Sequence, residues 1–404
     1  MKYIVVLGDG MADRPLSELG GKTPLEVAKK PGMDYMAKYG RSGMLRTLVQ
    51  GMPFGSDIAN LAVLGYDPKK YYAGGRGAFE AAALRIHLGP SDLAFRCNLI
   101  TEEKGVLRDY SAGHVSSREA EALIKHVDRV LGNGKMRFYP GVGYRHVMVL
   151  KDAGISYEDL LEQPPHDIVG KRIRTNLLKA KNRKAASIVD SLNEVMLSSK
   201  KALEGHAINI KRLEEKKLPA NMIWLWGAGK KPSMPSFRQK YGLSGALISA
   251  VYLLRGLAFC MDLEVVEVPG ATGYFDTDYP AKAEYALKAL EKNDFVYIHV
   301  EAPDEAGHDG NIAEKVKAIE KIDKEIVSRI MEEYGGRECR IAVLPDHATP
   351  IEARTHTPDP VPFVIYSPGM EGDGLSCYSE KEAAKGSYGT LDGVKFMEIL
   401  LKKE

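Results

Sequence analysis

Aspartate and histidine residues recur in the last quarter of the sequence with the spacing of metal ligands. Asp304 and His308 are separated by three residues, while Asp346 and His347 are adjacent and His356 follows them. Carboxylate oxygens together with imidazole nitrogens suit Zn²⁺, Mn²⁺ and similar ions. Adjacent side chains of a strand point to opposite faces, so Asp346 and His347 can converge only from a loop. The pattern therefore predicts a metal site.

The number of ligands bears on the number of ions. Asp9, within Gly8-Asp9-Gly10, adds a third carboxylate to three imidazoles. A lone histidine is more often a structural residue than a ligand, and the adjacent Asp346-His347 pair is what favours metal binding here. Six such groups exceed the need of one catalytic ion with an open position, and they suit two ions.

Ser56 stands at the predicted start of a helix. It follows the run Gly51 to Gly55, and Ile58, Leu61 and Leu64 have helical spacing. Serine commonly caps a helix N-terminus, which is the structural interpretation of this position. The alternative is a nucleophile, because helix N–H groups and the helix dipole would stabilise an anion beside the hydroxyl.

Arginine and histidine residues also occur beside glycines or strand edges in the middle of the chain. The segments are Phe95-Arg96-Cys97-Asn98, Asp109 to His114, and Gly141 to His146, which includes Arg145. The guanidinium fork suits carboxylate and phosphate groups. For each segment taken alone, a surface ion pair is the alternative.

Short apolar runs that end in polar loops predict the elements that position these residues. Such runs are typical of parallel central strands, and they occur at Tyr3–Leu7, Phe295–Val300, Arg340–Leu344 and Val361–Tyr366. Helical patterns over 281–291 and 312–333 separate them. This alternation predicts a layered α/β sheet with helices on both faces.

Ligands in open α/β sheets bind at the carboxyl ends of strands, where Asp9, Asp304 and Asp346 all fall. Because these strands come from both ends of the chain, the middle is predicted to be an insertion. We expect residues 1–74 and 226–404 to form one domain. Residues 75–225 would form a second, with strands at Val106–Tyr110 and His146–Leu150 and a helix over Ala185–Leu203.

Composition excludes several classes of protein. Lys and Arg total 56 against 54 Asp and Glu, which argues against a nucleic-acid binder. No apolar run is long enough to cross a membrane. The four cysteines form no Cys-x-x-Cys pair, so we expect a cytoplasmic protein. The basic run 171–184 is interpreted as solvated surface, with attraction of an anionic substrate as the alternative. Apolar helix faces are compatible with a homo-oligomer.

The order of these motifs resembles the alkaline phosphatase superfamily. The motifs are Gly8-Asp9-Gly10, Gly55-Ser56-Asp57, Asp304-x-x-x-His308, Asp346-His347 and Thr355-His356-Thr357. Within the superfamily, the chain is similar over its whole length to the archaeal-type 2,3-bisphosphoglycerate-independent phosphoglycerate mutases. Three further segments look typical of that branch: Phe95–Asn98, Tyr110–His114 and Pro269–Gly273.

The resemblance implies an alkaline-phosphatase-like layered α/β sheet domain with an inserted second, smaller α/β domain. It implies an isomerase that interconverts 3-phosphoglycerate and 2-phosphoglycerate in glycolysis and gluconeogenesis, with Ser56 as the nucleophile that becomes phosphoserine. It also implies two divalent ions, Mn²⁺, Zn²⁺, Co²⁺ or Mg²⁺. By motif, one ion is held by Asp304, His308 and His356, and the other by Asp9, Ser56, Asp346 and His347.

The middle domain would then supply a proton-handling histidine, His114. Substrate binding is expected at Arg96, Asn98, Arg145 and Lys240. Three alternatives stay open at this point. A metal-dependent phosphatase or phosphodiesterase would share every metal ligand, phosphopentomutase belongs to the same superfamily, and a non-catalytic metal-binding protein is the alternative from another class.

Overall fold

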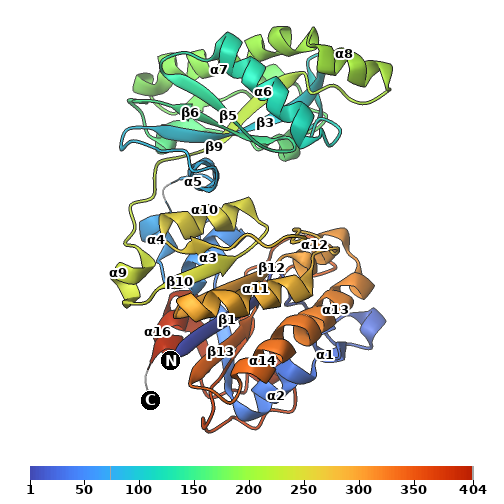
Figure 1. Cartoon of the computed structure of the whole chain (residues 1–404). Coiled ribbons are helices and arrows are strands. Elements are labelled where there is room, and N and C mark those ends of the chain that lie inside the picture. The colour runs from blue at the N-terminus through green and yellow to red at the C-terminus, as the bar shows by residue number, and fades with distance from the viewer. Residues whose placement is uncertain (73, 403–404) are drawn as a thin grey trace. The chain divides into compact units, whose positions relative to one another are not determined.

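The computed structural model describes residues 1–72 and 74–402 and divides into two compact units (Figure 1). The first unit comprises Met1–Tyr71 and Met234–Glu404, so both ends of the chain build it. The second unit is Tyr72–Ser233. Its sheet includes β9 (Met222–Gly229), so residues 226–229, expected in the first domain, extend the sheet of the inserted one.

The first unit contains an eight-stranded sheet. Its strands lie in the order β11 (Glu264–Val265), β10 (Gly245–Ile248), β12 (Phe295–Val300), β1 (Lys2–Gly8), β13 (Cys339–Leu344), β14 (Val361–Tyr366), β2 (Arg41–Arg46) and β15 (Thr390–Asp392). The strands β12, β1 and β13 are parallel neighbours at the centre. Their carboxyl ends therefore meet at one edge of the sheet.

Strand β14 runs antiparallel to both β13 and β2, which corrects the prediction that Val361–Tyr366 is parallel. A continuous apolar run indicates burial on both faces but not direction. A parallel return would need a crossover connection. Here the segment between β13 and β14 stays at the edge where β13 ends, and β14 starts from that edge.

Both faces of this sheet are covered, as shown by β12 and β13, in which every residue is buried. One face packs against α2 (Pro31–Tyr39), α11 (Tyr279–Lys292) and a run of helix from Ile312 to Tyr334. The helices of the unit are α1 (Pro24–Val27), α2 (Pro31–Tyr39), α3 (Ser56–Val63), α4 (Pro68–Tyr71), α9 (Phe237–Tyr241), α10 (Tyr252–Cys260), α11 (Tyr279–Lys292), α12 (Ala302–Asp309), α13 (Ile312–Lys321), α14 (Ser328–Tyr334), α15 (Glu380–Ala383) and α16 (Phe396–Leu401).

The predicted helix over 312–333 is one helical run with an internal irregularity. A π-helical segment, Ile322–Val327, joins α13 to α14. Its residue Asp323 accepts hydrogen bonds from the backbone N–H groups of Gly32 and Met33, at 3.1 and 2.6 Å. The segment thus caps the N-terminus of α2 from a neighbouring helix.

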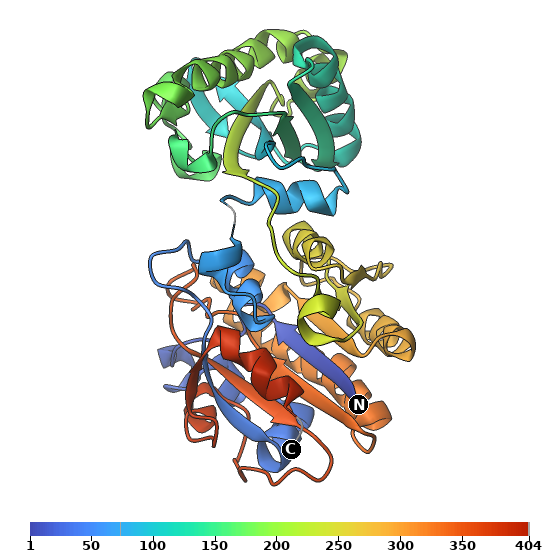
Figure 2. The same ribbon diagram turned by 90° about the vertical axis from the view of Figure 1, so that its left-hand side faces the viewer.

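The second unit is an antiparallel sheet covered by helices. Its strands are β3 (Leu93–Glu103), β4 (Val106–Asp109), β5 (Met136–Val142), β6 (Arg145–Leu150) and β9, with a separate two-stranded sheet of β7 (Leu160–Leu161) and β8 (Lys179–Ala180). Its helices are α5 (Gly77–Ala83), α6 (Ser117–Leu131), α7 (Arg183–Glu204) and α8 (Ala207–Glu214). In Figure 2 the strands of this unit lie beside the green helices.

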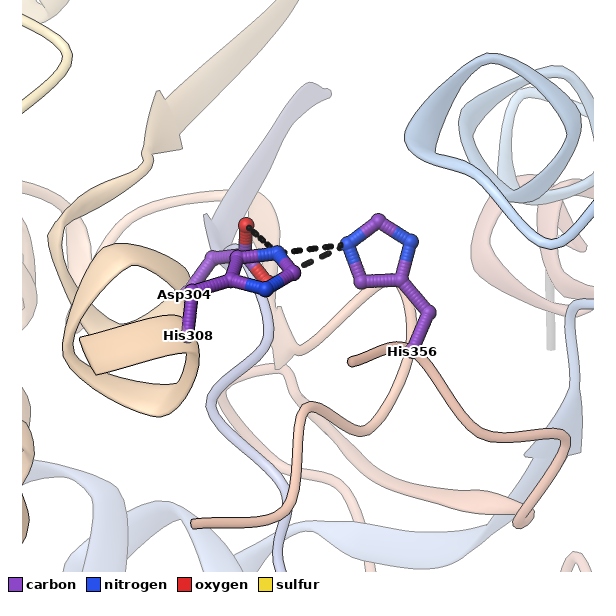
Figure 3. Close-up of side chains that lie close together, drawn as sticks. All are labelled: Asp304, His308 and His356. Atoms are coloured by element: carbon purple, nitrogen blue, oxygen red, sulfur yellow. Dashed lines mark hydrogen bonds and ion pairs between the residues drawn. The ribbon is translucent and has the colours of Figure 1, made fainter. Parts of the chain in front are cut away.

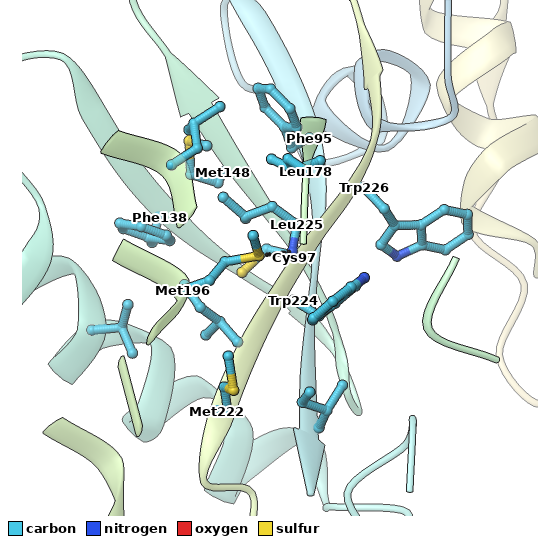
Figure 4. Close-up of a cluster of buried hydrophobic side chains, with 14 of the residues drawn as sticks. Phe95, Cys97, Phe138, Met148, Leu178, Met196, Met222, Trp224, Leu225 and Trp226 are labelled. Atoms are coloured by element: carbon cyan, nitrogen blue, oxygen red, sulfur yellow. Dashed lines mark hydrogen bonds between the residues drawn. The ribbon is translucent and has the colours of Figure 1, made fainter. Parts of the chain in front are cut away.

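The core of the second unit lies between the sheet and the helices α6 and α7. Phe95 and Cys97 of β3 pack there with Met196 of α7 and with Leu225 of β9 (Figure 4). Alternate residues of β3, Arg96 and Asn98, therefore lie on its other face. On that face Arg96 lies opposite Trp226 and Asn98 opposite Trp224, so two tryptophans of β9 flank the predicted substrate-binding side chains.

Candidate metal centre

The carboxyl ends of three adjacent strands carry the predicted ligands. Asp9 directly follows β1, Asp304 lies in α12 immediately after β12, and Asp346 and His347 follow β13. Because β1 pairs in parallel with both β12 and β13, these side chains reach the same edge of the sheet. All four residues are buried.

The first ligand set consists of Asp304, His308 and His356, whose side chains point toward one another (Figure 3). Helix α12 places Asp304 and His308 on one face, with His308 Nε2 at 3.3 Å from Asp304 Oδ2. His356 Nε2 lies 3.5 Å from Asp304 Oδ1 and 3.1 Å from His308 Nε2. Three ligand atoms from two segments thus face a common point.

Backbone carbonyls orient both imidazoles of this set. His308 Nδ1 is 3.0 Å from the carbonyl oxygen of Arg354, and His356 Nδ1 is 3.1 Å from that of Phe54. Since a carbonyl can only accept, each Nδ1 is assigned the hydrogen and donates it. When the imidazoles are neutral, Nε2 of each is therefore the nitrogen that offers its lone pair to a metal ion.

The second set consists of Asp9, Asp346 and His347, and the hydroxyl of Ser56 lies beside His347. His347 Nε2 lies 3.4 Å from Asp9 Oδ1, 3.6 Å from Asp346 Oδ2 and 3.2 Å from Ser56 Oγ. Asp346 is held in place by the backbone N–H groups of Gly10 and His347, which donate to its Oδ1 at 3.2 and 2.9 Å. The structure thus brings together all seven residues predicted as metal ligands, in two neighbouring sets.

Ser56 is the first residue of α3 and does not cap it. The N-cap is Gly55, and no side chain donates or accepts a cap hydrogen bond there. The serine hydroxyl is therefore left to face His347. Asn60, one turn along α3, holds the helix start to the cluster, because its Nδ2 donates to the Ser56 carbonyl and to Asp346 Oδ2, each at 2.8 Å.

Four buried side chains at the centre were not predicted. They are Asn60, Tyr297, His299 and Thr349. Tyr297 donates its hydroxyl to Asn60 Oδ1 at 2.6 Å, His299 Nε2 is 2.9 Å from Asp9 Oδ2, and Thr349 donates to Asp304 Oδ1. The available signal was the polar residue inside an apolar run: Tyr297 and His299 alternate with Val and Ile in the predicted strand 295–300.

The electrostatics of the centre reflect several carboxylates buried together. Burial, with the charges of Asp346 and Asp304, raises the pKa of Asp9 well above its usual range. Burial acts in the same sense on Asp304, but hydrogen bonds from His308 and His356 outweigh it and hold the pKa of Asp304 well below its usual range. The hydrogen bond with Asp304 raises the pKa of His308 to about 9. A proton on His308 therefore offsets part of the carboxylate charge.

The residues present fit divalent cations. Asp9 Oδ1 is buried and has no hydrogen-bond partner, although unpaired buried oxygens are costly. The carboxylates of Asp9, Asp304 and Asp346 lie in groups that could hold an ion, together with four imidazoles, those of His299, His308, His347 and His356. A positive ion is the natural complement of such a donor set, and the mixture of oxygen and nitrogen ligands suits Mn²⁺, Zn²⁺ and related ions.

The residues predicted to bind substrate lie mainly in the second unit. Arg96 is buried, pairs with Glu80 through Nε at 2.8 Å, and places its guanidinium carbon 4.5 Å from the centre of the Trp226 ring. Asn98 Oδ1 accepts the Trp226 indole N–H at 3.0 Å. Arg145 is exposed and pairs with Asn98 across β3 and β6. These three residues form one cluster.

His114 and Lys240 lie elsewhere. His114 is an exposed residue of the second unit, in a left-handed backbone conformation with φ of 51°. Lys240 belongs to α9 of the first unit and places its ammonium 5.3 Å from the ring centres of Tyr66 and Tyr241. Across residues 1–72 and 74–402, no helix has the length and apolar character needed to cross a bilayer.

The chain matches the metalloenzyme superfamily over residues 1–403. It is 48% identical to a 2,3-bisphosphoglycerate-independent phosphoglycerate mutase of Methanothermobacter thermautotrophicus, over 99% of this chain and 97% of the relative. It is 47% identical to the enzyme of that name from Methanothrix thermoacetophila, over 99% and 100% of the two chains. The superfamily match and the ligand sets together indicate divalent metal binding.

Solved structures agree with these similarities. A Pyrococcus horikoshii protein superposes with a TM-score of 0.84 and 30% identity, over 100% of this chain and 98% of the other. The cofactor-independent phosphoglycerate mutase of Thermoplasma acidophilum superposes with a TM-score of 0.66 and 29% identity, over 99% of each chain. With relatives this similar along nearly their full length, the chain belongs to the 2,3-bisphosphoglycerate-independent phosphoglycerate mutase family.

Proposed function

We propose that the protein interconverts 3-phosphoglycerate and 2-phosphoglycerate through a phosphoserine intermediate, without 2,3-bisphosphoglycerate. The observation that carries the proposal is the position of Ser56, whose hydroxyl lies at the start of α3 and 3.2 Å from His347 Nε2. The names of the relatives supply the substrate. The four cysteines form no Cys-x-x-Cys pair, which supports action in the reducing cytoplasm.

The first unit is assigned the phosphoryl transfer. Asp304, His308 and His356 would hold one divalent ion, and Asp9, Ser56, Asp346 and His347 would hold a second. Mn²⁺, Zn²⁺, Co²⁺ and Mg²⁺ are the candidate ions. When bound, such ions neutralise charge on the phosphoryl oxygens and favour ionisation of the serine hydroxyl.

The chain's own residues act on the nucleophile and the phosphate. The backbone N–H groups at the start of α3 and the helix dipole favour an anion beside Ser56. Asn60 donates to the carbonyl of Ser56 and thereby anchors the backbone at this position. Ser56 Oγ forms a bond to phosphorus as the bond to the glycerate oxygen breaks, and the second half-reaction reverses this with the other glycerate hydroxyl.

The second unit is assigned substrate recognition, the role expected of residues 75–225. His114 would give a proton to the departing glycerate oxygen and take one back in the second half-reaction, so the protons balance over the cycle. Arg96, Asn98 and Arg145 present donors and positive charge suited to the carboxylate and phosphate of the substrate. Lys240 of the first unit would add a further positive charge.

The test is the fate of 3-phosphoglycerate incubated with the purified protein. Turnover should be measured with each candidate ion in the absence of 2,3-bisphosphoglycerate, and the metal content should be determined on the same sample. Formation of 2-phosphoglycerate supports the proposal. Release of inorganic phosphate alone would assign the site to a phosphatase instead, and turnover of ribose 1-phosphate alone would assign it to a phosphopentomutase.

A further inference from the structure

His299 is a buried histidine that the assigned ligand sets do not use. It lies in the central strand β12 and is fully buried. Both of its ring nitrogens have polar partners: Nε2 is 2.9 Å from Asp9 Oδ2, and Nδ1 is 3.3 Å from Ser249 Oγ. The imidazole therefore links a ligand of the metal centre to a serine at the end of a neighbouring strand.

The direction of these hydrogen bonds follows from the contacts of Ser249. Ser249 Oγ accepts the backbone N–H of Val251 at 3.0 Å, which leaves its own hydrogen free to be donated. We assign that hydrogen to the bond with His299 Nδ1. The neutral imidazole then carries its hydrogen on Nε2 and donates it to Asp9 Oδ2.

This hydrogen bond makes the two oxygens of Asp9 unequal. Oδ2 is occupied by His299, whereas Oδ1 is buried without a hydrogen-bond partner and lies 3.4 Å from His347 Nε2. A carboxylate held by one oxygen presents the other in a fixed direction. In Asp9 that free oxygen is the one that faces the other members of the second ligand set.

We propose that His299, oriented by Ser249, is a positioning residue that holds Asp9 with Oδ1 directed at the ion of the Asp9, Asp346 and His347 set. The proposal rests on the proposed function only in taking these three residues as ligands of one ion. Partners that orient metal ligands in this way commonly contribute to affinity as well as to geometry.

His299 is not itself a ligand in this arrangement. A ring nitrogen of His299 lies within 4.8 Å of ligand oxygens of Asp9 and Asp346. With Nε2 donating to Asp9 and Nδ1 accepting from Ser249, however, the imidazole has no lone pair left for an ion. Lys282 donates its ammonium to the backbone carbonyl of His299 at 2.9 Å, which places a positive charge near this residue. That charge opposes a further cation at this position.

The test compares Mn²⁺ affinity in variants of the metal-free full chain, titrated calorimetrically without phosphoglycerate. A His308→Ala background weakens the other ligand set and so isolates the ion held by Asp9. In that background, His299→Leu should lower the affinity by about 10- to 100-fold, the usual effect of losing a partner that orients a ligand. His299→Gln, whose amide N–H can still donate to Asp9, should lie within about threefold of the background.

His146 provides the matched control, because it is a fully buried histidine in a strand of the second unit. His146→Leu should leave Mn²⁺ affinity unchanged. Unchanged Mn²⁺ affinity in His299→Leu would overturn the proposal. Equal losses of affinity in His299→Leu and His299→Gln would also overturn it, because they would indicate that the imidazole itself is a ligand. If His299→Leu does not fold, Ser249→Ala gives the same test. A severalfold loss of Mn²⁺ affinity in Ser249→Ala supports the role of Ser249 in orienting His299, and an unchanged affinity contradicts it. Because no substrate is present, a failure of the mutase assay would not affect this result.

Discussion

The hydroxyl of Ser56 lies 3.2 Å from Nε2 of His347, although 291 positions separate the two residues in the chain. The serine begins α3 and the histidine follows β13, so only the folded sheet brings them together. The cap of α3 belongs to Gly55, which leaves the serine side chain free of that structural role. The contact places a hydroxyl at the rim of a cluster of buried carboxylates and imidazoles.

Replacement of Ser56 by alanine should abolish mutase turnover. Because the hydroxyl is the proposed nucleophile, we expect kcat to fall by about 10³-fold or more. The matched control is Ser379→Ala, since Ser379 caps α15 and accepts the Glu382 N–H at 3.3 Å. That variant should lose about 1 kcal/mol of stability and keep its activity. Full turnover in Ser56→Ala, measured by 2-phosphoglycerate formation, would contradict the covalent route.

Asp346→Ala should be far more damaging to activity than His87→Ala. Asp346 is fully buried and accepts hydrogen bonds from two backbone N–H groups and from Asn60, in addition to its place in the ligand set. His87 is an exposed residue of the second unit. We expect a loss of at least about 10²-fold for the first and none for the second, measured as kcat/KM. Equal losses would be inconsistent with the ligand assignment.

Removal of metal should both inactivate and destabilise the protein. The carboxylates of Asp9, Asp304 and Asp346 repel one another when no cation lies between them. Ion binding to the folded state should therefore raise the melting temperature, by an amount that grows with ion concentration. Differential scanning calorimetry after chelation and after return of Mn²⁺ checks this, and a melting temperature independent of Mn²⁺ would count against the assigned centre.

Arg145→Ala should raise KM for 3-phosphoglycerate with little change in stability. Arg145 is exposed, so its removal leaves no buried group unpaired. A lost charge-assisted hydrogen bond to substrate predicts about a 10- to 100-fold rise. Arg137 of the same sheet pairs with Asp128 at 2.9 Å and serves as the control, because Arg137→Ala should leave KM unchanged. The assignment of Arg145 is wrong if both variants behave alike.

Stability should depend on pH through His146. Burial lowers the pKa of His146 from 6.5 to about 3 in the folded protein. A lowered folded-state pKa means that the stabilisation is complete above pH 6.5 and is lost as the pH falls toward 3. Between pH 7 and pH 5 this group should cost about 2 kcal/mol of unfolding free energy.

Denaturant unfolding of the full chain at the two pH values measures that cost. The His146→Leu variant has no group to titrate at this position, so its loss of stability between pH 7 and pH 5 should be smaller than that of the unaltered chain. Equal losses in the two proteins would exclude His146 as the source.

The sequence predicted the parts of the centre that form local motifs. Asp304 and His308 are four residues apart on a helix, and Asp346 and His347 are adjacent. The proximity of the two residues in each pair therefore follows from their spacing in the sequence. The strands that carry them were predicted from apolar runs ended by glycine or proline. The resemblance then added Ser56, whose hydroxyl could otherwise have been interpreted as a helix cap.

The remaining features depend on contacts between distant segments. Asn60 meets Asp346 and His299 meets Asp9 only across the folded sheet, and no spacing in the chain relates them. The direction of β14 was missed for a similar reason, because an apolar run reports burial but not the path of the chain before it. The predicted end of the inserted domain at residue 225 was too early for a similar reason. Strand β9 continues to pair with β3 as far as Gly229, and no local pattern in the sequence shows that pairing.

The most direct test of the account is the covalent state of the protein during turnover. The full chain with Mn²⁺ should be mixed with 3-phosphoglycerate, quenched in acid and digested, and its peptides examined by mass spectrometry. We predict one added phosphoryl group on the peptide that contains Ser56, dependent on the metal and absent from Ser56→Ala. Accumulation of 2-phosphoglycerate with the phosphoryl group on another residue, or at an undiminished rate in Ser56→Ala, would contradict the account.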